Sequence, residues 1–110
     1  MKRIDHIAIL VDDLEKCQKW YEDNCDAVLS YNDHKYKRMK MGNTTIALID
    51  TKHYPANHVG ILIENYEDLP TNGRRVEHRD GTVGVYKTDP EGNMVEFIYY
   101  SSELREKFGY

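Results

Sequence analysis

An internal repeat constrains the fold of this chain more than any other feature of its sequence. The segment HVGILIE at 58–64 aligns with HIAILVD at 6–12, and aligned positions are apolar, small or acidic in both copies. Each copy is rich in strand-forming residues and precedes a helix-like segment and three further strand-like segments. Because self-similarity of this kind marks repeated structural units, the chain is predicted to form two βαβββ modules in tandem.

In the first module, residues 13–24 carry apolar side chains at helical spacing, namely Leu14, Cys17 and Trp20 or Tyr21. The run Asp12-Asp13-Leu14-Glu15 is typical of a helix N-cap that is followed by a capping-box acid. Three strands are expected after the helix, at about 27–32, 36–41 and 44–50. The polar residues at 32–34 and 42–43 are typical of hairpin turns between them.

The second module has a weaker helix, because Pro70 and Gly73 interrupt its helical segment. Three strands are expected at about 76–79, 82–88 and 93–100, and the polar tail from Ser101 is expected to form one short helix. The interrupted helix leaves thin cover for the outward-facing residues of the second repeat strand, Val59, Ile61 and Ile63. Because exposed apolar surface of this kind usually marks an interface, a homodimer is predicted.

Length and charge narrow the class of protein. A chain of 110 residues is expected to form a single domain, with modules at about 3–50 and 57–100 and a tail at 101–110. The predicted class is α+β, with a cup-shaped mixed sheet and helices on its outer face. The net charge of −4 comes without a basic stripe, which argues against a nucleic-acid partner. No stretch is long and apolar enough to predict a membrane span.

The two cysteines predict no disulfide bond. If Cys17 and Cys25 lie on one helix, they are about 12 Å apart along its axis, which exceeds disulfide reach. Their spacing fits no thiolate metal site, so Cys17 is expected to pack in the interior. Since no export signal is evident either, a reducing cytoplasm is the predicted location.

The repeat places His6 and His58 at equivalent points on two equivalent strands. Because side chains alternate between the faces of a strand, each histidine shares its face with small or aliphatic residues: Ala8 and Leu10 in one copy, Gly60 and Leu62 in the other. The opposite faces carry bulky residues that suit packing under helices, namely Ile7, Ile9 and Val11 in the first copy. Both histidines are therefore expected on the face that helices do not cover.

A third candidate is Glu96, the one carboxylate in the apolar run 94–100, just after a turn at 89–92. A charge inside a buried strand is costly unless something pairs with it. If the modules pair about a pseudo-twofold axis, His6, His58 and Glu96 can converge. Two imidazoles and one carboxylate with open positions are typical of non-haem iron, and Mn, Ni, Co or Zn also fit. Taken singly, each residue has an alternative interpretation as an ordinary core, rim or edge residue.

These segments closely resemble the vicinal oxygen chelate superfamily, in IDHIAILVDDLEKCQKWYEDN near the start, NHVGILI in the middle and DPEGNMVEF near the end. The superfamily includes glyoxalase I, extradiol dioxygenases, methylmalonyl-CoA epimerase, fosfomycin-resistance enzymes and bleomycin-binding proteins. The resemblance covers residues 3–100, and the superfamily's metal positions match His6, His58 and Glu96. It implies a divalent metal in a cup-shaped sheet, chelated by vicinal oxygens of a small substrate.

One departure and one match separate the branches of the superfamily. Glyoxalase I and the epimerase carry a further Glu or Gln on the strand that here reads NTTIALID, where two registers place Ile46 or Ala47. Neither residue can ligate a metal or move a proton, which argues against both activities. The segment 76–96 fits the extradiol signature. By this resemblance His78 would orient or protonate, and Tyr86 would hydrogen-bond an oxygen at the metal.

The predicted function is therefore a metal-dependent enzyme most like an extradiol ring-cleaving dioxygenase, with Fe(II) as the favoured metal. The alternatives are a glyoxalase-like lyase or isomerase or a fosfomycin-resistance-type thiol transferase, and, as a non-enzyme, a protein that sequesters a small molecule. The fosfomycin-resistance-type reaction would need cationic side chains to hold a phosphonate. Arg38 and Lys40 are the candidates, because they alternate with Tyr36 on one predicted strand. A solvated strand face is the preferred interpretation of these two residues. His34 and His53 are expected at the surface.

Overall fold

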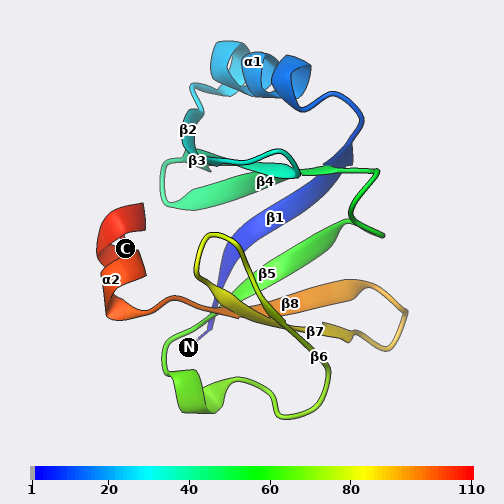
Figure 1. Ribbon diagram of the computed structural model, residues 1–110, viewed down its shortest axis with the longest axis vertical. Helices are drawn as coiled ribbons and strands as arrows, with labels where there is room; N and C mark the ends of the chain where they lie inside the picture. Colours follow the sequence, from blue (N-terminus) through cyan, green and yellow to red (C-terminus); the bar gives the residue numbers. More distant parts are fainter. Residues whose placement is uncertain (1) are drawn as a thin grey trace. The chain divides into compact units, whose positions relative to one another are not determined.

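The computed structural model describes residues 2–110, which contain eight strands, two α-helices and one 3-10 helix. In chain order the elements are β1 (Arg3–Val11), α1 (Leu14–Cys25), β2 (Val28–Asn32), β3 (Tyr36–Met41), β4 (Thr44–Asp50), β5 (His58–Ile63), η1 (Tyr66–Asp68), β6 (Arg74–Glu77), β7 (Val83–Thr88), β8 (Met94–Tyr99) and α2 (Ser102–Phe108) (Figure 1). This order confirms the α+β class and the tandem βαβββ pattern. The chain forms two compact units, His6–His58 and Val59–Tyr110 with the residues up to Asp5.

The unit of His6–His58 contains a mixed sheet in the strand order β2-β3-β4-β1. The β2–β3 and β3–β4 pairs are antiparallel, whereas β1 and β4 run parallel. The predicted ranges 36–41 and 44–50 agree with β3 and β4, because polar turns bound both strands at each end. Figure 1 shows α1 along one side of β2, β3 and β4.

Helix α1 covers the sheet face opposite His6. Its Leu14 and Cys17 pack with Met39, Ile46 and Leu48, in a core that also includes Val11. This arrangement confirms a helix on the outer face and the interior packing of Cys17, and both cysteines are free thiols. The prediction that Ile7 packs under a helix is wrong, since its side chain is 45% exposed. Helix α1 lies mainly against β3 and β4, and the residue of β1 that packs in the core beneath the helix is Val11.

Helix α1 begins one residue later than the predicted capping box requires. Asp13 is the N-cap, and its Oδ1 accepts a hydrogen bond from the backbone N–H of Lys16 at 3.0 Å. Glu15 is therefore not the acid of a capping box. Its Oε1 instead lies 3.6 Å from Nζ of Lys37, a lysine that is itself buried.

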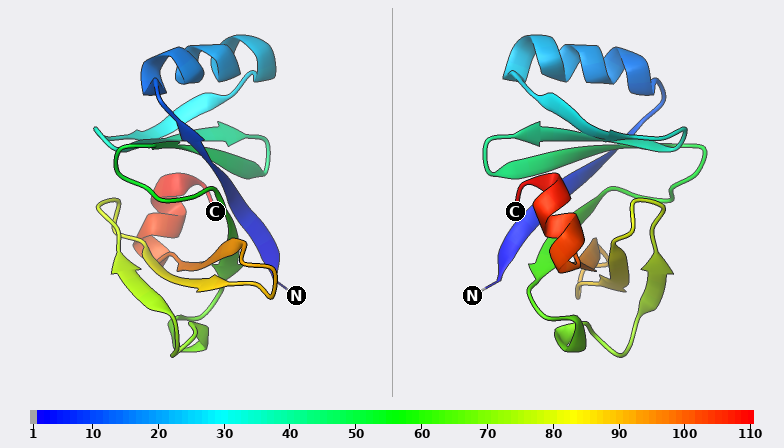
Figure 2. Two further views of the ribbon diagram at one scale, coloured as in Figure 1. Left: turned by 90° about the vertical axis from the view of Figure 1, so that its right-hand side faces the viewer. Right: turned by 60° about the vertical axis from the view of Figure 1, so that its left-hand side comes forward.

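The second unit contains strands in the order β5-β8-β7-β6, with β8–β7 and β7–β6 antiparallel (Figure 2). Its helical segment shortens to the three-residue η1, as the interrupting Pro70 and Gly73 predict. The prediction that Ile63 is poorly covered is wrong. Its side chain is 2% exposed, because Leu69 and Val85 pack against it. Homodimer formation stays a prediction.

The tail forms the predicted short helix, α2. Ser101 is its N-cap and accepts a hydrogen bond from the backbone N–H of Leu104 at 3.3 Å. Arg105 holds α2 to the second unit, because its guanidinium donates to the Glu64 carboxylate at 2.9 Å and to the Tyr100 carbonyl at 3.3 Å. Across residues 2–110, no helix has the length and apolar character that a membrane crossing needs.

The turn between β7 and β8 is organised by Asp89. Its Oδ1 accepts hydrogen bonds from the backbone N–H groups of Glu91 and Asn93, both at 2.9 Å, and its Oδ2 accepts one from the Asn93 amide at 2.9 Å. The Asn93 side chain, followed by its backbone N–H, holds the pKa of Asp89 below the ordinary 3.8. Gly92 completes the turn with a φ of +86°, a region that favours glycine.

Replacing Asp89 with alanine should lower the stability of the protein at neutral pH, because three hydrogen bonds of the turn are lost. Because the pKa of Asp89 is lower in the folded state, its full contribution to stability is present above about pH 3.8. That contribution is lost as the pH falls through the pKa of Asp89 in the folded protein. Urea unfolding of Asp89→Ala and wild type should therefore diverge at neutral pH and converge in acid. Glu91→Ala, in the same turn, is the matched control. An equal stability of both variants at neutral pH would contradict the role of Asp89.

Candidate metal centre

Two buried imidazoles meet where β1 and β5 carry the repeated histidines. His6 Nε2 and His58 Nε2 are 3.1 Å apart, and the two rings meet edge to face with centroids 5.2 Å apart. Both residues are buried, with 5% and 7% of their surface exposed. The equivalent positions that the repeat predicts are thus brought together within the unit of His6–His58.

The separation of these nitrogens fits a shared metal ion. At metal–nitrogen distances of about 2.0–2.1 Å, two ligands lie about 2.9 Å apart at a right angle and about 3.3 Å apart at a tetrahedral angle. The observed 3.1 Å falls between these values. Neutral imidazole nitrogens are common ligands of first-row divalent metals. The two histidines therefore suit, by chemistry and by spacing, two of the three predicted ligand positions.

Strand β4 provides the neighbours of His6. Thr45 pairs with His6 and Ala47 pairs with Ala8, so both lie on the histidine face. Of the two residues that the sequence suggested for a further ligand, Ile46 faces the core under α1. Thr45 was not considered, and it is the residue directly beside His6. No Glu or Gln occupies this face of β4.

Strand β3 adds two cations to the same face. Arg38 pairs with Ala47, and Lys40 pairs with Thr45. The expectation of a solvated strand face is wrong for Arg38, which is only 4% exposed, whereas Lys40 is half-buried. The sequence of a strand in which cations alternate with other residues is the same whether its polar face is exposed to solvent or buried by other segments. Local sequence alone could not have revealed this burial.

The third candidate ligand, Glu96, lies in the second unit on β8. Its side chain is 2% exposed, and Oε2 is 2.5 Å from Nε2 of His78, just beyond the end of β6. Tyr86 is the cross-strand partner of Glu96 on β7, and its ring centroid is 6.1 Å from that of His78. Three residues that the sequence singled out therefore cluster within this unit.

Two further residues shape this cluster and were missed in the sequence. A Cβ at Gly84 would overlap Oε2 of Glu96 and would lie 2.9 Å from its Cδ and 3.0 Å from Nε2 of His78. The guanidinium of Arg74 lies 4.8 Å from the centre of the Tyr86 ring. A glycine inside a strand often marks a close approach, so Gly84 could have been found from the run VGVY.

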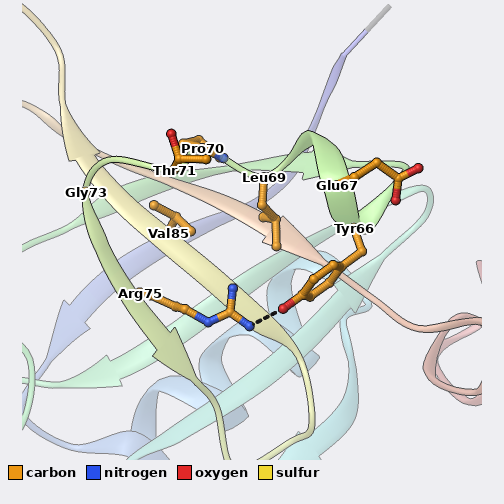
Figure 3. Close-up of a pocket in the computed structure, with 8 residues that line it drawn as sticks. All are labelled: Tyr66, Glu67, Leu69, Pro70, Thr71, Gly73, Arg75 and Val85. Atoms are coloured by element: carbon orange, nitrogen blue, oxygen red, sulfur yellow. Dashed lines mark hydrogen bonds between the residues drawn. The ribbon is translucent and has the colours of Figure 1, made fainter.

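A pocket of about 330 Å³ lies on the other face of β7 (Figure 3). Val85 lines it, and Val85 alternates with Gly84 and Tyr86 along the strand. Arg75 crosses the pocket and donates a 2.5 Å hydrogen bond to the Tyr66 hydroxyl. Leu69 contributes to the wall, so this pocket belongs to the side that η1 and its loop cover. It does not belong to the Glu96 side.

The remaining histidines are surface residues, as predicted. His34 and His53 are exposed in turns, with ring centroids 6.0 Å apart. His53 Nδ1 lies 3.2 Å from Oδ2 of Asp50. Backbone hydrogen bonding from Lys52, followed by the His53 side chain, holds the pKa of Asp50 below its usual range.

No protein-family model and no curated protein matches the sequence. Solved structures do resemble the chain. Methylmalonyl-CoA epimerase from Mycobacterium tuberculosis is 14% identical with a TM-score of 0.70, over 94% of this chain and 91% of that one. A glyoxalase/bleomycin resistance protein/dioxygenase superfamily member from Vibrio splendidus is 9% identical with a TM-score of 0.61, over 91% and 100%.

An extradiol ring-cleaving dioxygenase from B. fuscum is 19% identical with a TM-score of 0.63. The match covers 91% of this chain but 33% of the dioxygenase. The chain thus has the vicinal oxygen chelate fold, which confirms the fold that the sequence motifs implied. At these identities the likeness concerns the fold, and the reaction has to be argued from the site.

Proposed function

We propose that this protein is a metal-dependent enzyme that acts on a small oxygen-bearing substrate, and that His6, His58 and Glu96 bind the metal. The observation that carries the proposal is the buried pair of imidazole nitrogens 3.1 Å apart. Glu96 is the proposed third ligand because it is the one carboxylate in the apolar run 94–100 and because the superfamily motifs match it to a metal position. All three residues are buried, and each offers one imidazole nitrogen or carboxylate oxygen.

The bound ion would act as a Lewis acid that holds two vicinal oxygens of the substrate, with Fe(II) favoured and Mn, Zn, Ni or Co as alternatives. His78 would orient Glu96 through their hydrogen bond. Tyr86 would donate a hydrogen bond to the substrate from its place beside Glu96. Arg74, over the Tyr86 ring, would limit the motion of that ring.

The reaction proposed is ring cleavage of a catechol-like substrate, as in extradiol dioxygenases. Support comes from the signature over 76–96, from a set of three ligands and from the lack of Glu or Gln on the histidine face of β4. A second candidate is a thiol transferase of the fosfomycin-resistance type, because the buried Arg38 shares the face of His6. Both candidates need the same metal centre.

Metal analysis tests the centre itself. After anaerobic loading with Fe(II), Mn(II) or Zn(II) and desalting, the wild type should retain about one ion per chain, and His58→Ala should retain far less because one of three ligands is gone. His53→Ala, which removes an exposed imidazole from a turn, should bind like wild type. A wild type that retains no stoichiometric ion after loading would overturn the proposal.

The reaction is tested by aerobic assay of the iron-loaded protein against a panel of catechols. Dioxygenase activity should consume O2 and give a coloured ring-opened product. No O2 uptake with any catechol, in protein that retains its iron, would count against the dioxygenase and leave the thiol transferase as the candidate.

A further inference from the structure

We propose that the pocket beside η1 is a second binding site, which takes a small organic carboxylate between Arg75 and Tyr66. The pocket has a volume of about 330 Å³ and lies wholly within the unit of Val59–Tyr110. Tyr86 is the cross-strand partner of Glu96, and Val85, which lines the pocket, alternates with Tyr86 on β7. The pocket is therefore separate from the proposed metal centre, and this inference does not depend on the metal.

Strand register brings Arg75 to this pocket. Arg75 on β6 is the cross-strand partner of Val85 on β7, so the two side chains lie on the same face of the sheet. Leu69, from the loop after η1, packs on Val85, and the two residues are 7% and 2% exposed. Figure 3 shows the guanidinium beyond Leu69, next to the Tyr66 hydroxyl. The pocket thus has an apolar floor and a polar end.

The polar end offers adjacent hydrogen-bond donors. The Arg75 guanidinium donates to the Tyr66 hydroxyl at 2.5 Å and lies 5.3 Å from the centre of the Tyr66 ring. Within residues 2–110 these are its side-chain interactions, so no carboxylate there pairs with it. A guanidinium has five N–H donors, and a tyrosine hydroxyl that accepts a hydrogen bond can still donate its own proton. Neighbouring donors of this kind match the two oxygens of a carboxylate.

The charge that faces the pocket is positive. One acidic residue, Glu67, also lines it. Figure 3 shows the Glu67 side chain turned away from both Leu69 and the Arg75 guanidinium. Glu67 is exposed, so water and salt screen its charge. The pocket therefore favours an anion over a cation.

Packing fixes the loop that forms one wall of the pocket. Gly73 has a φ of +118°, and a Cβ there would lie 2.9 Å from Cγ1 of Val85 and 3.0 Å from Cγ of Lys87. The loop therefore rests directly on β7. Lys87 also donates a hydrogen bond to the side chain of Asn72 at 3.2 Å. A wall that is already in place reduces the ordering that a ligand must impose when it binds.

Size and lining define the class of ligand. A volume of about 330 Å³ is at the lower end of the range of about 300–1,000 Å³ that is typical of ligand pockets. Leu69, Pro70 and Val85 supply apolar surface. The expected ligand carries one carboxylate on a short aromatic or aliphatic group. Its carboxylate would lie at Arg75, and its apolar part would lie over Leu69 and Val85.

Three ligands of matched shape test the inference. At neutral pH, 3-phenylpropionate, 3-phenylpropanol and 3-phenylpropylamine carry a negative charge, no charge and a positive charge on the same aromatic chain. In an NMR titration of the isotope-labelled wild type as purified, 3-phenylpropionate should shift the backbone amides of 66–75 and 83–87. It should bind about 3- to 10-fold more tightly than the alcohol, the range for a partly solvated hydrogen bond to a charged group. The amine should bind no better than the alcohol.

Variants assign the preference to single side chains. Arg75→Gln should abolish the preference for the carboxylate over the alcohol, and Tyr66→Phe, which keeps the ring, should reduce it. Arg74→Gln is the matched control, because it removes a neighbouring positive charge whose guanidinium lies over the Tyr86 ring on the other face of the sheet. That variant should keep the preference. Glu67→Gln should keep it as well.

Four results would overturn the inference. They are equal wild-type affinity for the carboxylate and the alcohol, tighter binding of the amine, amide shifts confined to residues outside 66–75 and 83–87, and a preference that survives in folded Arg75→Gln. The comparison of ligands on the wild type needs no variant, so it decides if Arg75→Gln does not fold. Folded His58→Ala should bind 3-phenylpropionate like wild type. Loss of binding in that variant would assign the carboxylate to the metal centre and overturn a separate site.

Discussion

Replacing Gly84 with alanine is expected to destabilise the protein by about 1–3 kcal/mol and to reduce the affinity of the proposed metal site by about 10–100-fold. The reason is steric. A methyl group at this position would overlap Oε2 of Glu96 and crowd His78, with 2.9 Å to the Glu96 Cδ and 3.0 Å to the His78 Nε2. Glu96 is 2% exposed and hydrogen-bonded to His78, so it cannot swing into solvent without leaving its place.

The measurements are urea unfolding and metal content after anaerobic loading. Gly42→Ala is the matched control, because Gly42 has a φ of +57° and nothing within 4 Å of an added Cβ. That variant should lose about 1 kcal/mol through backbone strain and keep its metal. If Gly84→Ala binds metal as tightly as wild type, Glu96 either adapts to the methyl group or is not a ligand. Glu96→Ala would then decide between these two explanations.

The Tyr100→Phe variant is expected to lose about 2 kcal/mol of unfolding free energy, because it removes a donor from a buried carboxylate. Asp5 and Tyr100 are both 0% exposed, and the Tyr100 hydroxyl donates to Oδ2 of Asp5 at 2.7 Å. The Tyr110 hydroxyl donates to the other oxygen, Oδ1. A buried charge that loses one of its hydrogen bonds retains its full desolvation cost.

Tyr99→Phe is the control for this experiment. Tyr99 is the adjacent residue, half-buried, with its ring 5.4 Å from that of Tyr66. Loss of its hydroxyl should change stability by less than about 0.5 kcal/mol, as for most substitutions that remove no buried hydrogen bond. Thermal and urea unfolding of both variants provide the comparison. Equal stability of the two variants would show that the Asp5 carboxylate does not depend on Tyr100.

Several features could be derived from the sequence because they depend on local periodicity. The alternation of side chains along IDHIAILV and HVGILI placed both histidines on the strand face that helices do not cover. The repeat placed them at equivalent positions of two equivalent strands. Turn residues bounded β3 and β4 correctly, and Pro70 and Gly73 correctly predicted a short helix in the second module. The turn at Asp89 followed from the preferences of proline and glycine.

The tertiary structure decided which faces are covered and which atoms nearly touch. Arg38 is buried although its strand reads as a solvated face, and Ile7 is exposed although its strand reads as a covered one. Gly84 is required by Glu96, twelve residues further along the chain and on the neighbouring strand. Backbone pattern determines the direction of a side chain, whereas burial and close contact depend on which distant segments pack against it. The histidine pair could therefore be predicted from the sequence, and the residues that surround it could not.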